Sequence, residues 1–210
     1  MLSLLASIDF TDVIYWSDYG FSPGIDLGFF TLRFYSLAYL IGVFFAYWHV
    51  SKMIMGPQSP MEQRHVEDLF FYCTLGVIIG GRIGYAAFYR PDLFTGFGGD
   101  GLVSWELIRL WDGGMSFHGG LLGVTLAMIW VSWRNNLQFL RVTDYISVGV
   151  PMGMLLGRLA NFTNGELWGR TTDVPWGMIF PGAGDIPRHP SQLYQAGLEG
   201  LLMLVLMSLL

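Results

Sequence analysis

The chain has 210 residues with 11 basic and 16 acidic side chains, and 53% of its residues are hydrophobic. Soluble domains carry about 25% charged residues, so a water-soluble fold of this composition would leave much apolar surface uncovered; an integral membrane protein is predicted instead. The net charge of −5 with a single lysine argues against nucleic-acid binding, and the lone Cys73 excludes an internal disulfide.

Five stretches are apolar and long enough, or nearly so, to cross a membrane, which requires ~20 residues. In chain order they cover about residues 32–50, 69–89 and 113–133, then begin at 145 and near 190. They predict an all-α, polytopic membrane protein with five transmembrane helices, and residues 1–210 are predicted to form a single domain. The fifth stretch runs to Leu210 without a polar flank, so we expect a natural chain that continues beyond it.

The distribution of basic residues predicts the orientation. Residues 1–31 contain four aspartates and no lysine or arginine. Lys52 and Arg64 lie between the first two spans, and Arg134 and Arg141 lie between the third and fourth. This pattern favours an N-terminus outside the membrane, with segments 90–112 and 170–189 also facing outward.

Two arginines lie inside predicted spans, where a charge is costly and marks a candidate functional site. Arg82 and Arg158 each follow an aspartate by 14 residues, which places both ~21 Å along their helices, toward the outer leaflet. Either guanidinium could bind a lipid phosphate, or it could hold helices together through carbonyl groups or an internal acid. The similar surroundings, GRIG and GRLA, indicate a faint internal repeat or a chance likeness of glycine-rich sequence.

The densest polar segment is GRLANFTNGELWGR, residues 157–170. Glycines at 149, 153 and 157 predict a ridge for close backbone packing, and Pro151 is expected to loosen the start of this helix. Asn161 and Asn164 could donate hydrogen bonds to ester or glycerol oxygens. Glu166 could orient an arginine or transfer a proton.

Three further residues are candidates with competing structural explanations. His118 stands between two glycine pairs in WDGGMSFHGGLLG, where glycines would let backbone amides approach a ligand and a neutral histidine could act as a base. His189, in RHPSQLYQ, is expected at the outer surface near lipid headgroups, although helix entry explains most of that motif. Tyr35 is expected to be an interfacial aromatic unless the fold places it in the pocket. Because the histidines are scattered singly, no metal site is predicted, and no cofactor is expected.

The residues alone predict an outer-leaflet pocket with Arg158, Asn161, Glu166 and His118. Such a pocket fits a phospholipid-modifying enzyme, but also a phospholipid or anion transporter with intramembrane arginines. A structural membrane scaffold would leave the polar segment 157–170 unexplained.

The motifs GGRIGY, WDGGMSFHGGLLG, GRLANFTNGELWGR and RHPSQLYQ, in this order over residues 81–195, resemble the bacterial prolipoprotein diacylglyceryl transferases. The resemblance implies transfer of a diacylglyceryl group from phosphatidylglycerol to the lipobox cysteine thiol of a prolipoprotein signal peptide. A thioether forms and glycerol phosphate leaves. It also implies a bacterial cytoplasmic (inner) membrane protein whose active site faces the periplasmic leaflet.

The resemblance also implies residue roles. Arg158 matches the phosphatidylglycerol-binding arginine of the family, His118 its candidate base and Tyr35 its first-helix tyrosine. Asn161, Glu166 and Gly169 match positions of its conserved motif. We therefore expect catalytic roles for His118, Arg158, Glu166 and Tyr35; the residues expected to bind substrate are Arg158, Asn161, Asn164, Gly169, Arg82 and His189. The family has seven membrane helices, so a chain that ended at Leu210 is expected to have little or no activity.

Overall fold

The structure is a computed structural model that describes residues 14–28, 31–57, 59–95, 105–110 and 113–209. It divides into two compact units. The first unit comprises residues 1–45 and 148–210, and the second unit comprises residues 46–147. Most described residues are helical, which confirms the coarse prediction of an α-helical protein.

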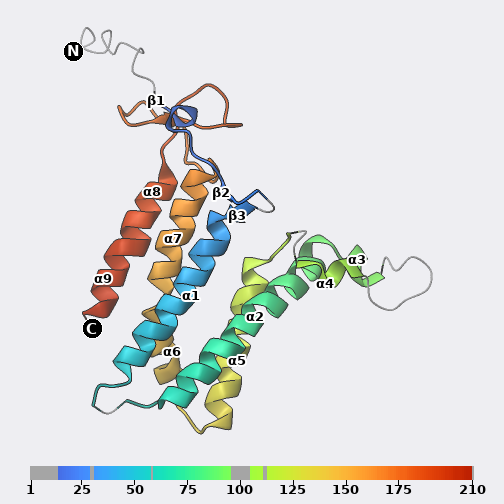
Figure 1. The fold of residues 1–210 in the computed structure, drawn as a ribbon, viewed down its shortest axis with the longest axis vertical. Coiled ribbons are helices and arrows are strands. Elements are labelled where there is room, and N and C mark those ends of the chain that lie inside the picture. The colour runs from blue at the N-terminus through green and yellow to red at the C-terminus, as the bar shows by residue number, and fades with distance from the viewer. Residues whose placement is uncertain (1–13, 29–30, 58, 96–104, 111–112, 210) are drawn as a thin grey trace. The chain divides into compact units, whose positions relative to one another are not determined.

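The first unit is built around helix α7 (Val150–Thr163). This helix packs against α8 (Ser191–Gln195) and the π-helix η4 (Ala196–Leu202), which continues into α9 (Met203–Ser208) (Figure 1). The unit also contains the start of α1 (Phe34–Met53) and the short 3-10 helix η2 (Trp16–Tyr19). A methyl carbon placed on Gly200 would lie 2.7 Å from the Cα of Leu155, so glycine lets η4 approach α7 closely.

Two small sheets in the first unit correct the all-α prediction. Strand β1 (Ile14–Tyr15) pairs in parallel with β4 (Met178–Ile179), and β2 (Gly24–Asp26) pairs antiparallel with β3 (Thr31–Arg33). The first sheet lies over an apolar cluster of Phe162, Met178 and Phe180, against which side chains such as Trp16 and Trp168 pack. Sequence periodicity missed these strands because two- and three-residue pairs are too short to show alternation.

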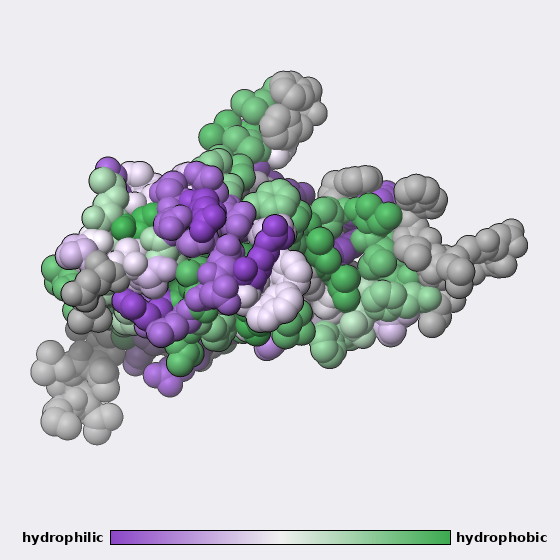
Figure 2. Space-filling model, turned by 90° about the horizontal axis from the view of Figure 1, so that it is seen from below, coloured by the Kyte–Doolittle hydropathy of each residue, from purple (hydrophilic) through white to green (hydrophobic). Residues whose placement is uncertain are grey.

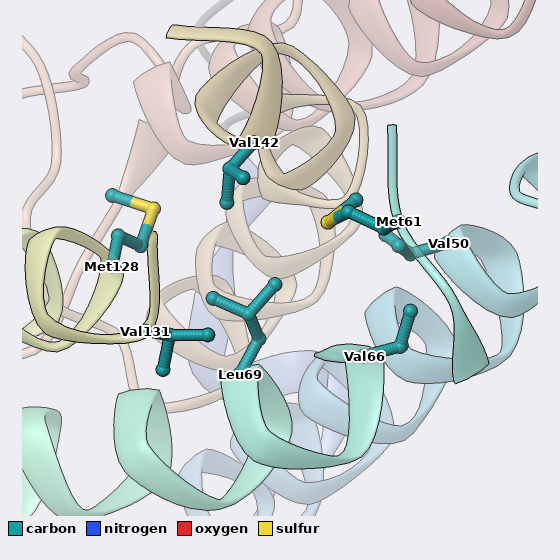
Figure 3. Packing of buried hydrophobic residues seen from close by; sticks show 7 residues of the cluster. All are labelled: Val50, Met61, Val66, Leu69, Met128, Val131 and Val142. Atoms are coloured by element: carbon teal, nitrogen blue, oxygen red, sulfur yellow. The ribbon is translucent and has the colours of Figure 1, made fainter. Parts of the chain in front are cut away.

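The second unit is built on two long helices that lie side by side, α2 (Gln63–Tyr89) and α5 (Phe117–Arg134) (Figure 1). The short helices α3 (Asp92–Thr95) and α4 (Trp105–Ile108) lie between them in the sequence, and α6 (Phe139–Ser147) follows α5. Its core contains aliphatic and methionine side chains that point toward one another (Figure 3): Val50, Met61, Val66, Leu69, Met128, Val131 and Val142. Cys73 packs at the edge of this core, as the apolar run around it predicts.

Glycines bring α2 and α5 into backbone contact. A methyl carbon placed on Gly84 would lie 2.7 Å from the Cα of Gly119, and Gly76 and Gly80 meet Gly123 and Gly119 as closely. The sequence placed the close-packing ridge on 149–157 instead. In that segment, a methyl carbon placed on Gly42 of α1 would lie 3.4 Å from the Cα of Gly153. A methyl carbon placed on Gly157 would have no described neighbour within 4 Å. The glycines between α2 and α5 therefore pack more tightly than the glycines of residues 149–157.

Adjacent glycines of α5 provide a matched test of this packing. Gly119→Ala is expected to lower the melting temperature in detergent, because the added carbon would meet the Gly80 carbonyl and lie 2.8 Å from the Cα of Gly84. Overpacking of this kind costs about 1–3 kcal/mol. Gly120→Ala is the control, because its nearest contact is 3.7 Å away and alanine favours helix by about 1 kcal/mol. Equal melting temperatures for the two variants would refute the close contact.

Two of the described helices are long and apolar enough to cross a membrane, α1 and α2, and the bent pair α6 and α7 makes a third if it is one span. Pro151 occupies the first turn of α7, where a proline without an N–H is tolerated. The third and fifth predicted stretches form α5 and the continuous run α8–η4–α9. Figure 2 shows hydrophilic side chains gathered on the face seen from below. In the second unit, exposed basic residues lie at the end of α1, the start of α2, the end of α5 and the start of α6: Lys52, Arg64, Arg134 and Arg141.

Candidate active site

A network of polar side chains lies in the first unit where α7 ends and α1 begins. The Tyr35 hydroxyl donates a hydrogen bond to the Glu166 carboxylate and accepts one from the Asn161 amide. The Asn164 amide donates to the same Glu166 oxygen at 3.1 Å. Tyr35, which the sequence left as an interfacial aromatic or a pocket residue, therefore belongs to the polar cluster.

The turn after α7 fixes the position of Glu166. Its backbone N–H donates to the Asn161 carbonyl at 3.1 Å, so the chain folds back onto the last turn of the helix. Both neighbours have left-handed backbone angles, with φ of 66° at Gly165 and 57° at Leu167. A positive φ is unfavourable for leucine, and such strain is typical of functional turns.

Arg158 lies on α7, one turn before Asn161. Its Nη1 donates to the Asn161 side-chain oxygen at 3.4 Å, the one hydrogen bond that its guanidinium makes among the described residues. Within this described part of the chain it also forms no ion pair, with Glu166 or any other acid. Most of its donors are therefore available to a ligand, and a planar guanidinium suits a phosphate group.

Two hydrogen bonds connect this network to the start of α8 and the residues before it. The buried Gln192 donates its amide N–H to the Glu166 carbonyl at 2.6 Å. Gly169 donates its backbone N–H to the His189 carbonyl at 2.9 Å, and a side chain there would collide with Ser191 and His189. Gly169 is thus required for close approach of two segments, which gives a structural reason for glycine at this predicted site position.

Arg82 has a different environment from Arg158. Its side chain is buried in the second unit, and its five N–H donors all reach backbone carbonyls; these belong to Glu106, Leu107, Arg109, Gly113 and Gly114. The structural alternative for Arg82 is therefore favoured, since a phosphate would have to displace these carbonyls. The two arginines are not equivalent, which removes the support for an internal repeat.

His118 is exposed in the first turn of α5, after Ser116, whose hydroxyl accepts the Gly119 N–H at 3.2 Å. The glycines on its C-terminal side pack against α2 rather than toward a ligand. His118 and Arg82 belong to the second unit, and the Tyr35–Glu166 network belongs to the first. In the first unit, the Nδ1 atom of His189 lies 3.2 Å from the Tyr194 hydroxyl oxygen.

Comparisons with known proteins identify the family. The family model described as prolipoprotein diacylglyceryl transferase matches residues 24–210. A phosphatidylglycerol–prolipoprotein diacylglyceryl transferase of Erythrobacter litoralis is 65% identical over 198 residues, covering 94% of this chain and 68% of the relative. The chain belongs to the prolipoprotein diacylglyceryl transferase family.

Two further relatives carry the same name. The protein of Zymomonas mobilis is 46% identical, with 91% of this chain and 68% of the relative covered. The protein of Aeromonas hydrophila is 47% identical, with 93% and 69% covered. The family predicted from the motifs of residues 81–195 is therefore confirmed, and the chain is a membrane transferase; the roles of individual residues stay predictions.

In this member of the prolipoprotein diacylglyceryl transferase family, two supporting residues were missed from sequence. Gln192 was passed over within RHPSQLYQ, and Trp16 lay outside every motif. The Trp16 indole donates to the Phe162 carbonyl at 2.7 Å, which ties the chain before α1 to the end of α7. A glutamine in an apolar helix start was the one local signal for Gln192; nothing near Trp16 in the sequence pointed to Phe162.

Proposed function

We propose that this protein transfers the diacylglyceryl group of phosphatidylglycerol to the lipobox cysteine thiol of prolipoproteins. Family membership and the names of the relatives support diacylglyceryl transfer from phosphatidylglycerol to prolipoproteins. The observation that carries the site assignment is the Tyr35–Asn161–Glu166 network beside an arginine with most of its donors unused. That arrangement combines a phosphate-binding cation with fixed polar groups.

In the reaction, the cysteine thiol loses its proton and the sulfur attacks the diacylglycerol carbon that carries the phosphate ester. A C–S bond forms, the C–O bond breaks, and glycerol phosphate leaves with the bonding electron pair. His118 takes the thiol proton, and Arg158 stabilises the negative charge that develops on the leaving phosphate. Arg82 and His189 remain as predicted substrate contacts, although the carbonyl partners of Arg82 favour a structural role.

The amides of the network position the lipid. Asn161 donates to Tyr35, which donates to Glu166, so the carboxylate is oriented by a relay of two hydrogen bonds. The side-chain oxygen of Asn164 is buried and has no partner among the described residues. A buried acceptor of this kind calls for a donor. We therefore assign Asn164 to a glycerol hydroxyl of phosphatidylglycerol, as an acceptor rather than as the donor that the sequence indicated.

The proposed topology has five spans in residues 1–210, acting as one transferase domain in the bacterial inner membrane. The exposed basic residues at the end of α1, the start of α2, the end of α5 and the start of α6 support a cytoplasmic location for these helix ends. The N-terminus then lies outside, and the end of α7, with Asn161 and Glu166, faces the periplasmic leaflet.

A transfer assay tests the proposed function. The full natural chain in nanodiscs with phosphatidylglycerol is incubated with a lipobox peptide that contains one cysteine. We expect a diacylglyceryl mass gain on the peptide and release of one glycerol phosphate for each transfer. A serine-for-cysteine peptide and phosphatidylcholine nanodiscs are the controls. No mass gain, together with flipping of fluorescent phosphatidylglycerol in vesicles, would replace the transferase with the transporter alternative.

A further inference from the structure

A second group of hydrogen-bond donors lies in the first unit, outside the Tyr35–Glu166 network. Arg170, His189, Ser191 and Tyr194 line one pocket. Arg170 comes from the segment after the Glu166 turn, and the other three come from the start of α8 and the residues before it. Two segments almost 20 residues apart therefore supply one concave site.

The lining of this pocket favours an anion. It contains a guanidinium, an imidazole and two hydroxyl groups, and no carboxylate of the described residues lines it. The exposed Arg170 guanidinium has no hydrogen-bond or ion-pair partner in the described part of the chain. By contrast, Arg188 nearby uses its guanidinium for the Ala183 carbonyl at 3.2 Å and the Gly169 carbonyl at 3.4 Å.

Hydrogen bonds hold the pocket side chains in place before any ligand arrives. The Trp176 indole N–H donates to the Tyr194 hydroxyl at 2.6 Å. The same hydroxyl lies 3.2 Å from the Nδ1 of His189, and the tautomer of the imidazole decides which of the two groups donates. These two contacts hold the Tyr194 and His189 side chains next to each other.

The backbone also shapes the pocket. His189 donates its N–H to the Arg170 carbonyl at 3.0 Å and accepts the Gly169 N–H at 2.9 Å, so residues 169–170 and 189 are held together. Ser191 is the closest described neighbour of the space that a Gly169 side chain would occupy. The same start of α8 carries Gln192, which binds the Glu166 carbonyl. The pocket is thus joined rigidly to the proposed catalytic network.

We infer that the Arg170–His189–Ser191–Tyr194 pocket binds a phosphate ester anion, at a subsite separate from Arg158. An arginine fork beside the hydroxyl donor of Ser191 matches the oxygens of a phosphate. The anion is either the soluble glycerol phosphate that the proposed reaction releases or the headgroup of a phosphatidylglycerol molecule. The choice between these two sources rests on the proposed function.

Titration of glycerol phosphate tests the pocket. The probe is added to the protein in phosphatidylcholine nanodiscs and followed by calorimetry, with phosphatidylglycerol retention measured by native mass spectrometry. Arg170→Gln is expected to weaken the affinity for one of these two ligands at least ~10-fold, which is about 1.4 kcal/mol. Arg170→Lys should have an intermediate effect, because it keeps the charge without the fork. Arg64→Gln, which changes an exposed arginine of the other unit paired with Glu62, is the control.

The outcomes separate the sources and the proposals. Loss of glycerol phosphate binding identifies the soluble anion, and loss of phosphatidylglycerol retention alone identifies the headgroup. In the Arg158→Gln variant, the protein should still bind one of the two ligands, and this remaining binding should be lost when Arg170 is also changed to glutamine. Unchanged affinity for both ligands in Arg170→Gln would overturn the inference. If wild type shows Arg170-dependent binding but no transfer to a lipobox peptide, the proposed function fails while the anion site stands.

Discussion

Changing Arg158 to alanine is expected to lower kcat/KM for phosphatidylglycerol by about 10³-fold, because loss of one group that stabilises a developing oxyanion costs about 10²–10³-fold. Arg158→Lys should lower kcat/KM by about 10²-fold, because an ammonium keeps the positive charge but cannot donate two parallel hydrogen bonds to a phosphate, as a planar guanidinium does. Among the described residues, the guanidinium makes one hydrogen bond, at 3.4 Å to the Asn161 side-chain oxygen. Little folding stability should therefore be lost with it.

The measurement is peptide lipidation rate at several phosphatidylglycerol concentrations, with melting temperatures recorded in parallel. Arg64→Ala serves as the control for loss of an arginine, because its side chain is 70% exposed and pairs only weakly with Glu62. Normal kcat/KM in Arg158→Ala would reject the phosphate-binding role and leave the transferase assignment intact.

Changing Arg82 to methionine is expected to destabilise the second unit and release the segment that precedes α5. Hydrogen bonds to charged groups are worth about 1.5–3 kcal/mol each, and five carbonyls would lose their donor together. Water can replace some of them, so we expect a loss of about 3–5 kcal/mol. Arg82→Lys should fall between wild type and methionine because lysine has three donors.

Hydrogen–deuterium exchange of peptides from 105–110 and 113–120 measures this release directly. Arg90→Met is the matched control, one arginine further along the same chain segment and at the C-terminal end of α2. Arg90 is exposed and ion-pairs with Asp92 at 2.7 Å and Glu106 at 3.6 Å, contacts that contribute little at a surface. If the backbone amides of these peptides exchange no faster in Arg82→Met than in Arg90→Met, the hydrogen bonds from Arg82 to the five carbonyls do not hold the segment in place.

The long helices could be predicted from sequence because each lies in a long apolar run, whereas the short helices α3 and α4 and the separate helix α6 were not predicted. The fifth predicted stretch begins near Pro190, and α8 begins at Ser191. The start of α2 was placed six residues late, since five of the six residues Gln63–Asp68 are polar. They enter the helix because Glu62 and His65 form reciprocal hydrogen bonds at its N-terminus, a pairing that hydropathy does not register.

The site was predictable in its composition but not in its contacts. Asn161, Asn164 and Glu166 could be grouped because six residues of one segment contain them all. Tyr35 is 126 residues from Asn161, so its place in the network depends on how α1 meets α7. The carbonyls around Arg82 could not be foreseen either, because backbone groups leave no trace in the amino-acid pattern.

Gly119 and Gly120, which follow His118, pack against α2, whereas the His118 side chain does not take part in this packing. Gly119 is fixed by contact with Gly80 and Gly84, whereas the His118 side chain is exposed. Substitutions at Gly119 should therefore lower the folding yield, whereas the base role proposed for His118 predicts that its substitutions lower turnover. A laboratory library randomised across this motif should lose Gly119 variants at the expression step and His118 variants only when the surviving proteins are assayed.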